Sequence, residues 1–149
     1  MYEDTLTAKE GIRSWASFEG MHEAMPEYFD SYYQRRAENN IHIRSIHPDT
    51  PLARERTKND AKEMRESRLV PADTYNWVPE IQVYDDKVNI ASWMEKLGII
   101  IESREIASAL GAIFDLSYLG AEHVSSAKLP KPSRSAPKTS SDAEGNQDH

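Results

Sequence analysis

The chain of 149 residues contains no cysteine. This absence excludes disulfide bonds, thiolate metal sites and a cysteine nucleophile, and it fits the cytoplasmic location that we expect. No apolar run approaches the roughly 18 residues that a membrane-spanning helix needs, so we expect no membrane association. The first five residues, Met1 to Thr5, also lack the basic and apolar regions of a signal peptide.

An excess of basic charge is missing as well, and the formal net charge is −7. Residues 125–149 contain four basic and three acidic side chains, a net of +1, so residues 1–124 hold a net of −8. Unaided binding to duplex DNA needs clustered Lys and Arg side chains at the phosphates. The acidic part of the chain therefore argues against such binding.

The length of the chain predicts one domain with a substantial core. Residues 125–149 are rich in Ser, Pro, Lys and Ala and contain no aromatic residue. They cannot bury enough apolar surface to offset the entropy of ordering, so we predict a disordered tail. Residues 11–124 would form the domain, and residues 1–10 would be a short helix, the end of a linker helix.

Hydrophobic periodicity predicts the elements of the first half of this domain. Apolar side chains alternate along residues 12–18 and 41–46, which predicts two strands. Between them, apolar residues recur at helical spacing from Met21 to Asn40, with Pro26 in the first turns, where proline is tolerated. We predict a loop for residues 47–51, a charged peripheral helix for residues 52–66 and a short strand for residues 68–71.

Three further strands are predicted in the second half. Residues 81–84 and 88–92 alternate around a turn, and the continuous apolar run 97–101 is typical of a strand buried on both faces. A last helix, capped by Ser103, would run to Leu119. Its inward face would hold Ile106, Leu110, Ile113, Phe114 and Ser117. The order β-α-β-α-β-β-β-α predicts an α/β fold, a mixed β-sheet flanked by helices.

Several segments together resemble one family. They are residues 27–36 (Glu-Tyr-Phe-Asp-Ser-Tyr-Tyr-Gln-Arg-Arg), 41–51, 80–92, 98–107 and 113–114. In this order they are similar to the C-terminal effector domain of TrmB-type prokaryotic transcriptional regulators, over roughly residues 8–118. The resemblance implies a phospholipase D-like fold, a homodimer and a small-molecule effector, a sugar or an anion. It also implies that DNA is bound only through an N-terminal winged helix-turn-helix, for which this chain has no room.

Phospholipase D-type catalysis needs a His-x-Lys-x4-Asp motif, in which histidine attacks phosphorus and lysine stabilises the phosphate charge. Placing the aspartate at Asp85 puts Val78 at the histidine position and Glu80 at the lysine position, and a shift by one residue gives Trp77 and Pro79. Neither register fits, and a carboxylate at the lysine position would repel a phosphate. We therefore predict a non-catalytic domain of a TrmB-like regulator, for ligand sensing, dimerisation or both.

Two other functions stay open. His42-x-Arg44-x4-Asp49 is a near match to the motif with arginine in place of lysine. A phosphodiesterase or nuclease of the phospholipase D superfamily that uses His42 or His47 is therefore an alternative. The simpler interpretation is an alternating strand whose His42 and Arg44 face solvent or a partner. The third function is a protein-interaction module without a small ligand.

A polar ligand site is expected where the strands end, because open α/β sheets bind ligands at the carboxyl ends of their strands. His47 and Asp49 follow one strand, and Ser17 and Glu19 end another. Trp77 or Tyr75 would supply a stacking wall. The alternative is that these side chains cap helices and turns. The five histidines are scattered and form no His-x3-His pair, so we expect neither a metal site nor a cofactor.

Overall fold

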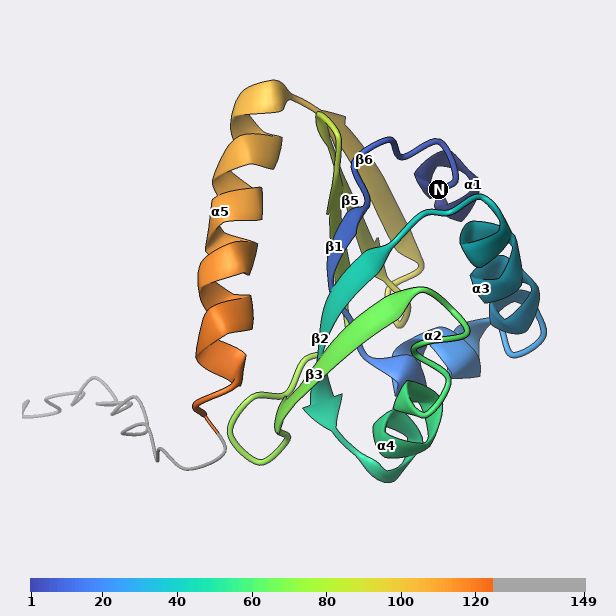
Figure 1. Cartoon of the computed structure of the whole chain (residues 1–149), viewed down its shortest axis with the longest axis vertical. Helices are drawn as coiled ribbons and strands as arrows, with labels where there is room; N and C mark the ends of the chain where they lie inside the picture. Colours follow the sequence, from blue (N-terminus) through green and yellow to red (C-terminus); the bar gives the residue numbers. More distant parts are fainter. Residues whose placement is uncertain (125–149) are drawn as a thin grey trace, which may run out of the picture.

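The computed structural model describes residues 1–124, which build a six-stranded β-sheet with helices on both faces (Figure 1). The order in the sheet is β3-β2-β1-β4-β5-β6. The strands β1, β2 and β3 are parallel neighbours, whereas β4, β5 and β6 continue the sheet in antiparallel fashion. Their bounds are β1 (Ile12–Trp15), β2 (Ile43–Asp49), β3 (Arg65–Pro71), β4 (Glu80–Tyr84), β5 (Lys87–Ser92) and β6 (Leu97–Glu102). The predicted tail, residues 125–149, lies outside the described residues.

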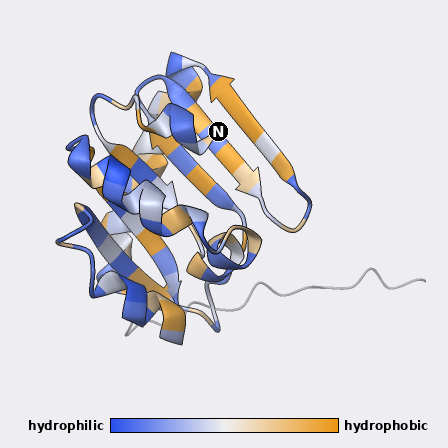
Figure 2. Cartoon of the chain, turned by 90° about the vertical axis from the view of Figure 1, so that its right-hand side faces the viewer, coloured by the Kyte–Doolittle hydropathy of each residue, from blue (hydrophilic) through white to orange (hydrophobic). Residues whose placement is uncertain are grey.

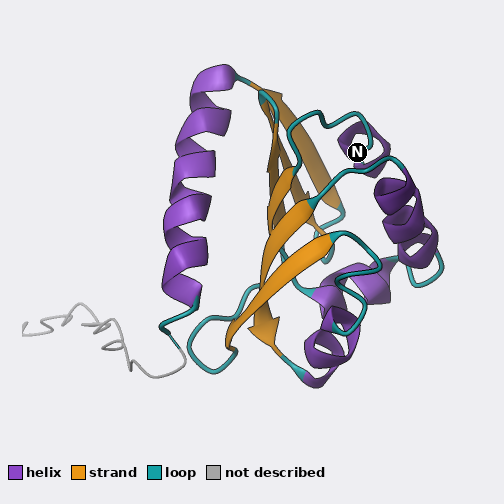
Figure 3. Ribbon diagram, viewed as in Figure 1, coloured by secondary structure: helices purple, strands orange, loops and turns teal. Residues whose placement is uncertain are grey.

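The helices of residues 1–124 are divided unequally between the two faces (Figure 3). One face is covered by α1 (Tyr2–Thr5), α2 (Phe18–Ala24), α3 (Tyr28–Glu38) and α4 (Pro51–Thr57), and the other by α5 (Arg104–Ala121). None of these helices is long and apolar enough to cross a membrane. The predicted α/β fold, a mixed sheet flanked by helices, is confirmed.

The two halves of the sheet follow from their connections. Helices connect the parallel strands β1, β2 and β3, because a parallel neighbour requires a crossover. Tight turns connect the antiparallel strands, and Asp85 and Lys96 in these turns have φ angles of +48° and +53°, the left-handed conformation that Asp tolerates well. The Asp85 carboxylate also accepts hydrogen bonds from the backbone N–H groups of Lys9 and Glu10, at 3.0 and 3.3 Å. This turn therefore ties β4 and β5 to the segment that enters β1.

The helix predicted from Met21 to Asn40 is divided into two. α2 ends at Ala24 and α3 begins at Tyr28. Met25 has a φ angle of −143° and a ψ angle of 72°, outside the helical region. Pro26 is the physical reason, because the residue before a proline is pushed out of the helical conformation.

The predicted loop at residues 47–51 is wrong, because β2 extends through Asp49. His47, Pro48 and Asp49 pair in register with the last residues of β3. The helix predicted over residues 52–66 is also too long. α4 ends at Thr57, and β3 already begins at Arg65. The buried Arg65 accounts for this, since its Nε donates to Asp60 at 2.7 Å and a continuous helix would place these two residues on different sides.

The predicted burial of residues 97–101 on both faces is wrong. Figure 2 shows β6 as an apolar strand at the edge of the sheet. It pairs with β5 alone, and Leu97, Ile99 and Ile100 are exposed. An apolar run does not reveal the position of a strand in the sheet, which the order of the strands decides.

The predicted inward face of the last helix is partly wrong. Phe114 is buried and Leu110 packs against the core, whereas Ile106 and Ile113 are exposed. The face that packs on the sheet consists of Ala107, Gly111, Phe114, Tyr118 and Ala121. Ser103 caps the helix as predicted, because its hydroxyl accepts a hydrogen bond from the Ile106 N–H.

The short helix α1 contributes to the core. Tyr2 and Thr5 are buried, and Tyr2 packs against Phe29 and Tyr32 at ring-centroid distances of 5.0 Å. That residues 1–10 are the end of a linker helix stays a prediction.

Candidate functional site

A row of buried polar side chains crosses the sheet beneath α1 to α4. Alternate residues of a strand face the same side, and the strand registers align this row. Asn89 donates to Gln82 at 3.0 Å, Gln82 donates to Glu80 at 3.0 Å, and Ser14 donates to the same carboxyl oxygen at 3.3 Å. The Tyr2 hydroxyl donates to the other oxygen of Glu80. The row ends in a carboxyl group held by three donors.

The pKa of Glu80, the acid in this row, is strongly shifted. Burial raises its pKa from 4.5 to about 8, and the hydrogen bond from Gln82 opposes the shift. In the register set by Asp85, this carboxyl occupies the position of the motif's lysine. Such a group cannot stabilise a phosphate charge, and its neighbours already satisfy its hydrogen-bonding oxygens.

His47 lies in the core rather than at an open site. Its Nδ1–H donates to the Ala16 carbonyl at 3.0 Å, so that Nε2 accepts from the Ser45 hydroxyl at 2.8 Å. The ring stacks on Phe18 with centroids 4.1 Å apart. Burial, and next the charge of Arg65, lower the pKa of His47 to about 3. The imidazole is therefore neutral and both of its nitrogens are engaged.

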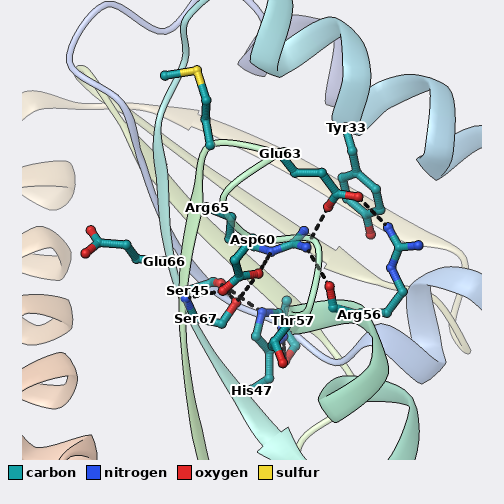
Figure 4. Close-up of polar contacts among 12 residues, drawn as sticks. Tyr33, Ser45, His47, Arg56, Thr57, Asp60, Glu63, Arg65, Glu66 and Ser67 are labelled. Carbon is teal, nitrogen blue, oxygen red and sulfur yellow. Dashed lines mark hydrogen bonds and ion pairs between the residues drawn. The ribbon is translucent and has the colours of Figure 1, made fainter.

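The charge of Arg65, which acts on His47, is paired with neighbouring carboxylates (Figure 4). Its guanidinium donates to Asp60 at 2.7 Å and to Glu63 at 2.5 Å, and it lies over the rings of Phe18 and Tyr33 at 5.2 Å each. Asp60 in turn accepts from the backbone N–H of Ser67 at 2.9 Å. These paired charges tie β3 to the segment that follows α4 and place two carboxylates beside Arg65.

The near match of His42, Arg44 and Asp49 does not form a constellation. His42 and Asp49 stand seven residues apart along an extended segment, roughly 23 Å. Arg44 donates to Asp115 at 3.0 Å, and Asp49 accepts from Arg54 at 2.6 Å. The pKa of Asp49 is lowered by that hydrogen bond. Each residue has a local structural partner instead of a common substrate position.

Ser17 and Glu19 do lie together, in a cavity of about 270 Å³ at the carboxyl end of β1. The Ser17 hydroxyl donates to Glu19 at 3.3 Å. The indole N–H of Trp93 is buried and has no partner among residues 1–124. The lining consists of Ser17, Glu19, Gly20, Glu23, Ala24, Val78, Trp93 and Met94. The cavity combines two carboxylates with an aromatic wall.

Gly20 lets α2 approach Val78 and Trp93 closely at the wall of this cavity. A Cβ atom at this position would lie 3.1 Å from the Val78 Cγ1 and 3.3 Å from the Trp93 Cδ1. Sequence reasoning missed Trp93 and Glu23. The only signal for Trp93 was an aromatic residue directly after a strand, whereas Glu23 looked like any exposed helix residue.

Comparison with known proteins finds solved structures with a similar fold, TrmBL2 among them. No protein-family model matches the sequence, and no curated protein matches it. The chain is similar in structure to TrmBL2, described as an archaeal chromatin protein with a novel mode of DNA binding. The TM-score is 0.57 and the sequence identity 10%, over 79% of this chain and 46% of that chain. The chain has the fold of part of TrmBL2. At this identity the likeness concerns the fold alone, and it spans less than half of the length of TrmBL2.

The five predicted ligand-binding residues thus do not share one site. Ser17 and Glu19 line the cavity at the end of β1, His47 lies in the core and Asp49 pairs with Arg54 at the surface. Trp77 lies in a groove of about 330 Å³ beside α5, where Trp15, Tyr75 and Val124 are among its neighbours. No cluster of three His, Asp or Glu side chains in residues 1–124 is arranged to hold a metal ion.

Proposed function

We propose that this chain is a non-catalytic, ligand-sensing domain of a TrmB-like transcription regulator, with a phospholipase D-like fold and a homodimeric assembly. The observation that carries the proposal is Glu80, a buried carboxyl that stands at the lysine position of the motif when Asp85 is taken as its aspartate. The fold likeness to TrmBL2 supports it. Duplex DNA would be bound through a winged helix outside residues 1–124, in keeping with their net charge of −8.

The effector site of this proposal is the cavity lined by Ser17, Glu19, Glu23 and Trp93. It lies at the carboxyl end of a strand, the position at which open α/β sheets bind ligands. Its volume of about 270 Å³ is close to that of small-ligand pockets, roughly 300 Å³ and above. The indole of Trp93 adds an aromatic wall to this cavity.

The chemistry of the cavity favours a neutral sugar over an anion. Carboxylates accept hydrogen bonds from hydroxyl groups but repel phosphate and other anions. The indole of Trp93 and the thioether of Met94 offer apolar contacts to the C–H face of a sugar ring. The expected effector is therefore a neutral mono- or disaccharide, bound through Glu19 and Glu23.

A thermal-shift screen tests this proposal on the full chain. We expect neutral saccharides to raise the melting temperature and the corresponding sugar phosphates to leave it unchanged. A ligand that binds only the folded protein, at a concentration of a hundred times its Kd, raises the free energy of unfolding by about 2.7 kcal/mol. Glu19→Gln should abolish the shift, whereas Glu27→Gln, an exposed acidic residue outside the cavity, should retain it. Shifts by sugar phosphates alone would contradict the proposed cavity, and the absence of any shift would favour the protein-interaction module.

The enzymatic alternative receives no support from the geometry, and it has its own test. A generic phosphodiester such as bis(p-nitrophenyl) phosphate should not be hydrolysed by the protein in the presence of EDTA. A measurable metal-independent rate that disappears in His42→Ala would reject the non-catalytic assignment. His47→Ala is a poorer probe because that ring is part of the core.

A further inference from the structure

The outer face of α5 is unusually apolar. The exposed fractions of Ile113, Leu116 and Leu119 are 52%, 75% and 63%, and Ile106 is 43% exposed. Charged side chains are confined to one flank and the two ends of the helix, and Asp115 on that flank already pairs with Arg13 and Arg44. Large apolar side chains that gather on one surface mark an interaction site.

The spacing of these residues indicates what kind of element covers them. Apolar or small residues recur at alternating intervals of three and four positions, at Ile106, Ala109, Ile113, Leu116 and Gly120. This is the heptad spacing with which one helix packs against another along a seam. The inward face, centred on Phe114, is already used by the sheet. α5 thus has a second helix-packing face with no partner among residues 1–124.

The sheet beside α5 is also incompletely covered. Six strands at about 4.8 Å spacing span roughly 24 Å between the outer strands, whereas one helix with its side chains is about 10 Å wide. Ile101 packs beneath α5, and Ile99 and Leu97 lie on the same side of β6 because alternate residues of a strand share a side. Both are exposed. The groove of about 330 Å³ at Trp77 continues this apolar surface along α5.

We propose that a second copy of this chain covers this surface, with α5 packed against α5 of the partner around a two-fold axis. The inference rests on the homodimer of the proposed function and specifies its interface. A heptad seam is complementary to a seam of the same kind, which is what a two-fold interface requires.

The outer face of α5 would form only part of a full-sized dimer interface. α5 has 18 residues and is therefore about 27 Å long, so its outer face alone projects roughly 270 Å². A standard interface buries about 800 Å² per partner. The exposed side of β6 and the groove at Trp77 would contribute the rest of the interface. Both lie on the apolar flank of the seam, because Ile99 of β6 and Trp15 and Ile46 of the groove belong to one cross-strand row.

Measurement of oligomeric mass on the full chain tests the interface. We expect the wild-type chain to be a dimer by light scattering and sedimentation, and Leu116→Glu to be a folded monomer by circular dichroism. Ser108→Glu is the matched control, since it introduces the same side chain at an exposed position of α5 outside the seam, and it should remain dimeric. A Leu116→Glu variant that is still dimeric would overturn the proposed interface but not the proposed homodimer. A wild-type chain that is monomeric would overturn both the interface and the homodimer. The effector cavity is tested separately, by the thermal shift with saccharides.

The absence of cysteine provides a second measurement. Ile113 is the central residue of the seam, so a single cysteine at this position lies near the two-fold axis in either helix orientation. Ile113→Cys should form an intermolecular disulfide in mild oxidant, and Ser108→Cys should not. Equal cross-linking of the two variants would contradict the seam.

Discussion

Replacement of the buried Glu80 by glutamine should change the pH dependence of stability. The carboxyl accepts hydrogen bonds from Tyr2, Ser14 and Gln82. An amide of the same shape keeps an acceptor for Ser14 and Gln82, and the Tyr2 hydroxyl can turn to accept from its NH₂ group. Glu80→Gln should therefore fold and lack one buried titratable group.

The sign of the effect follows from the raised pKa. The folded protein retains the Glu80 proton up to about pH 8, whereas the unfolded chain releases it near 4.5. The stability contributed by the neutral carboxyl is therefore complete below pH 4.5 and is lost as the pH rises to about 8, by about 1.4 kcal/mol per pH unit. His47 acts in the opposite direction between pH 3 and 6.5, because its pKa is lowered to about 3. The two slopes cancel between pH 4.5 and 6.5, and wild-type stability should fall by about 2 kcal/mol between pH 6.5 and 8.

Urea unfolding at pH 5, 6.5 and 8, followed by tryptophan fluorescence, measures these changes. The stability of Glu80→Gln should rise by about 2 kcal/mol from pH 5 to 6.5, through His47, and then stay level. The free energy of unfolding of the variant, relative to that of wild type, should increase by up to about 4 kcal/mol between pH 5 and 8. This is an upper limit because three hydrogen bonds are donated to the carboxyl. Parallel pH profiles for the two proteins would refute the reasoning.

Three further substitutions test the packing around β3 and α4 by urea unfolding. Arg65→Met should destabilise by up to about 3–5 kcal/mol, because it leaves the partly buried Asp60 without an ionic partner and Glu63 with Arg56 alone. A loss below about 1 kcal/mol would mean that these ions are solvated. Arg36→Lys should cost about 1–3 kcal/mol, since one ammonium cannot reproduce the fork that donates to the carbonyls of Ile41, Glu63 and Met64. Thr50→Ala should cost about 1 kcal/mol, because its hydroxyl caps α4 by accepting from the Ala53 N–H at 3.1 Å, and a conservative Thr50→Ser should recover most of the loss.

Periodicity predicted the strands of the sheet better than it predicted the burial of their side chains. Alternation located β1, β2, β4 and β5, although polar members of the pattern such as Ser14, Gln82 and Asn89 are themselves buried beneath α1 to α4. The apolar run of β6 was misinterpreted, since a strand inside a sheet and an edge strand with an exposed apolar surface have the same composition. The sequence does not directly specify the order of the strands in the sheet. The structure shows that the antiparallel meander places β6 at the edge.

The same ambiguity affected α5 and the candidate site. A helix that is apolar on two sides has no unique inward face, so Ile106 and Ile113 were assigned to the core and Ala107 and Gly111 were overlooked. The effector cavity joins α2 to the turn after β5, residues about 70 positions apart in the chain. Local patterns identified Ser17 and Glu19 because they end a strand. They could not identify Trp93, whose role depends on tertiary packing.

The two proposals together make one more prediction, because the cavity and the interface share a segment. Trp93 and Met94 line the cavity, and the turn after them leads within three residues to Leu97, which lies at the proposed interface. If saccharide binding shifts this turn, it must change the dimer affinity, and linkage requires that dimerisation change the saccharide affinity by the same factor. Coupling between sites is typically 5- to 150-fold, so Leu116→Glu should bind the saccharide with a Kd altered by a factor in that range. Calorimetric titration of wild type and variant measures it, with Ser108→Glu as the control. Equal Kd values for all three proteins would mean that the cavity binds its ligand without affecting the dimer, and a sensing mechanism that acts through dimer geometry would then be rejected.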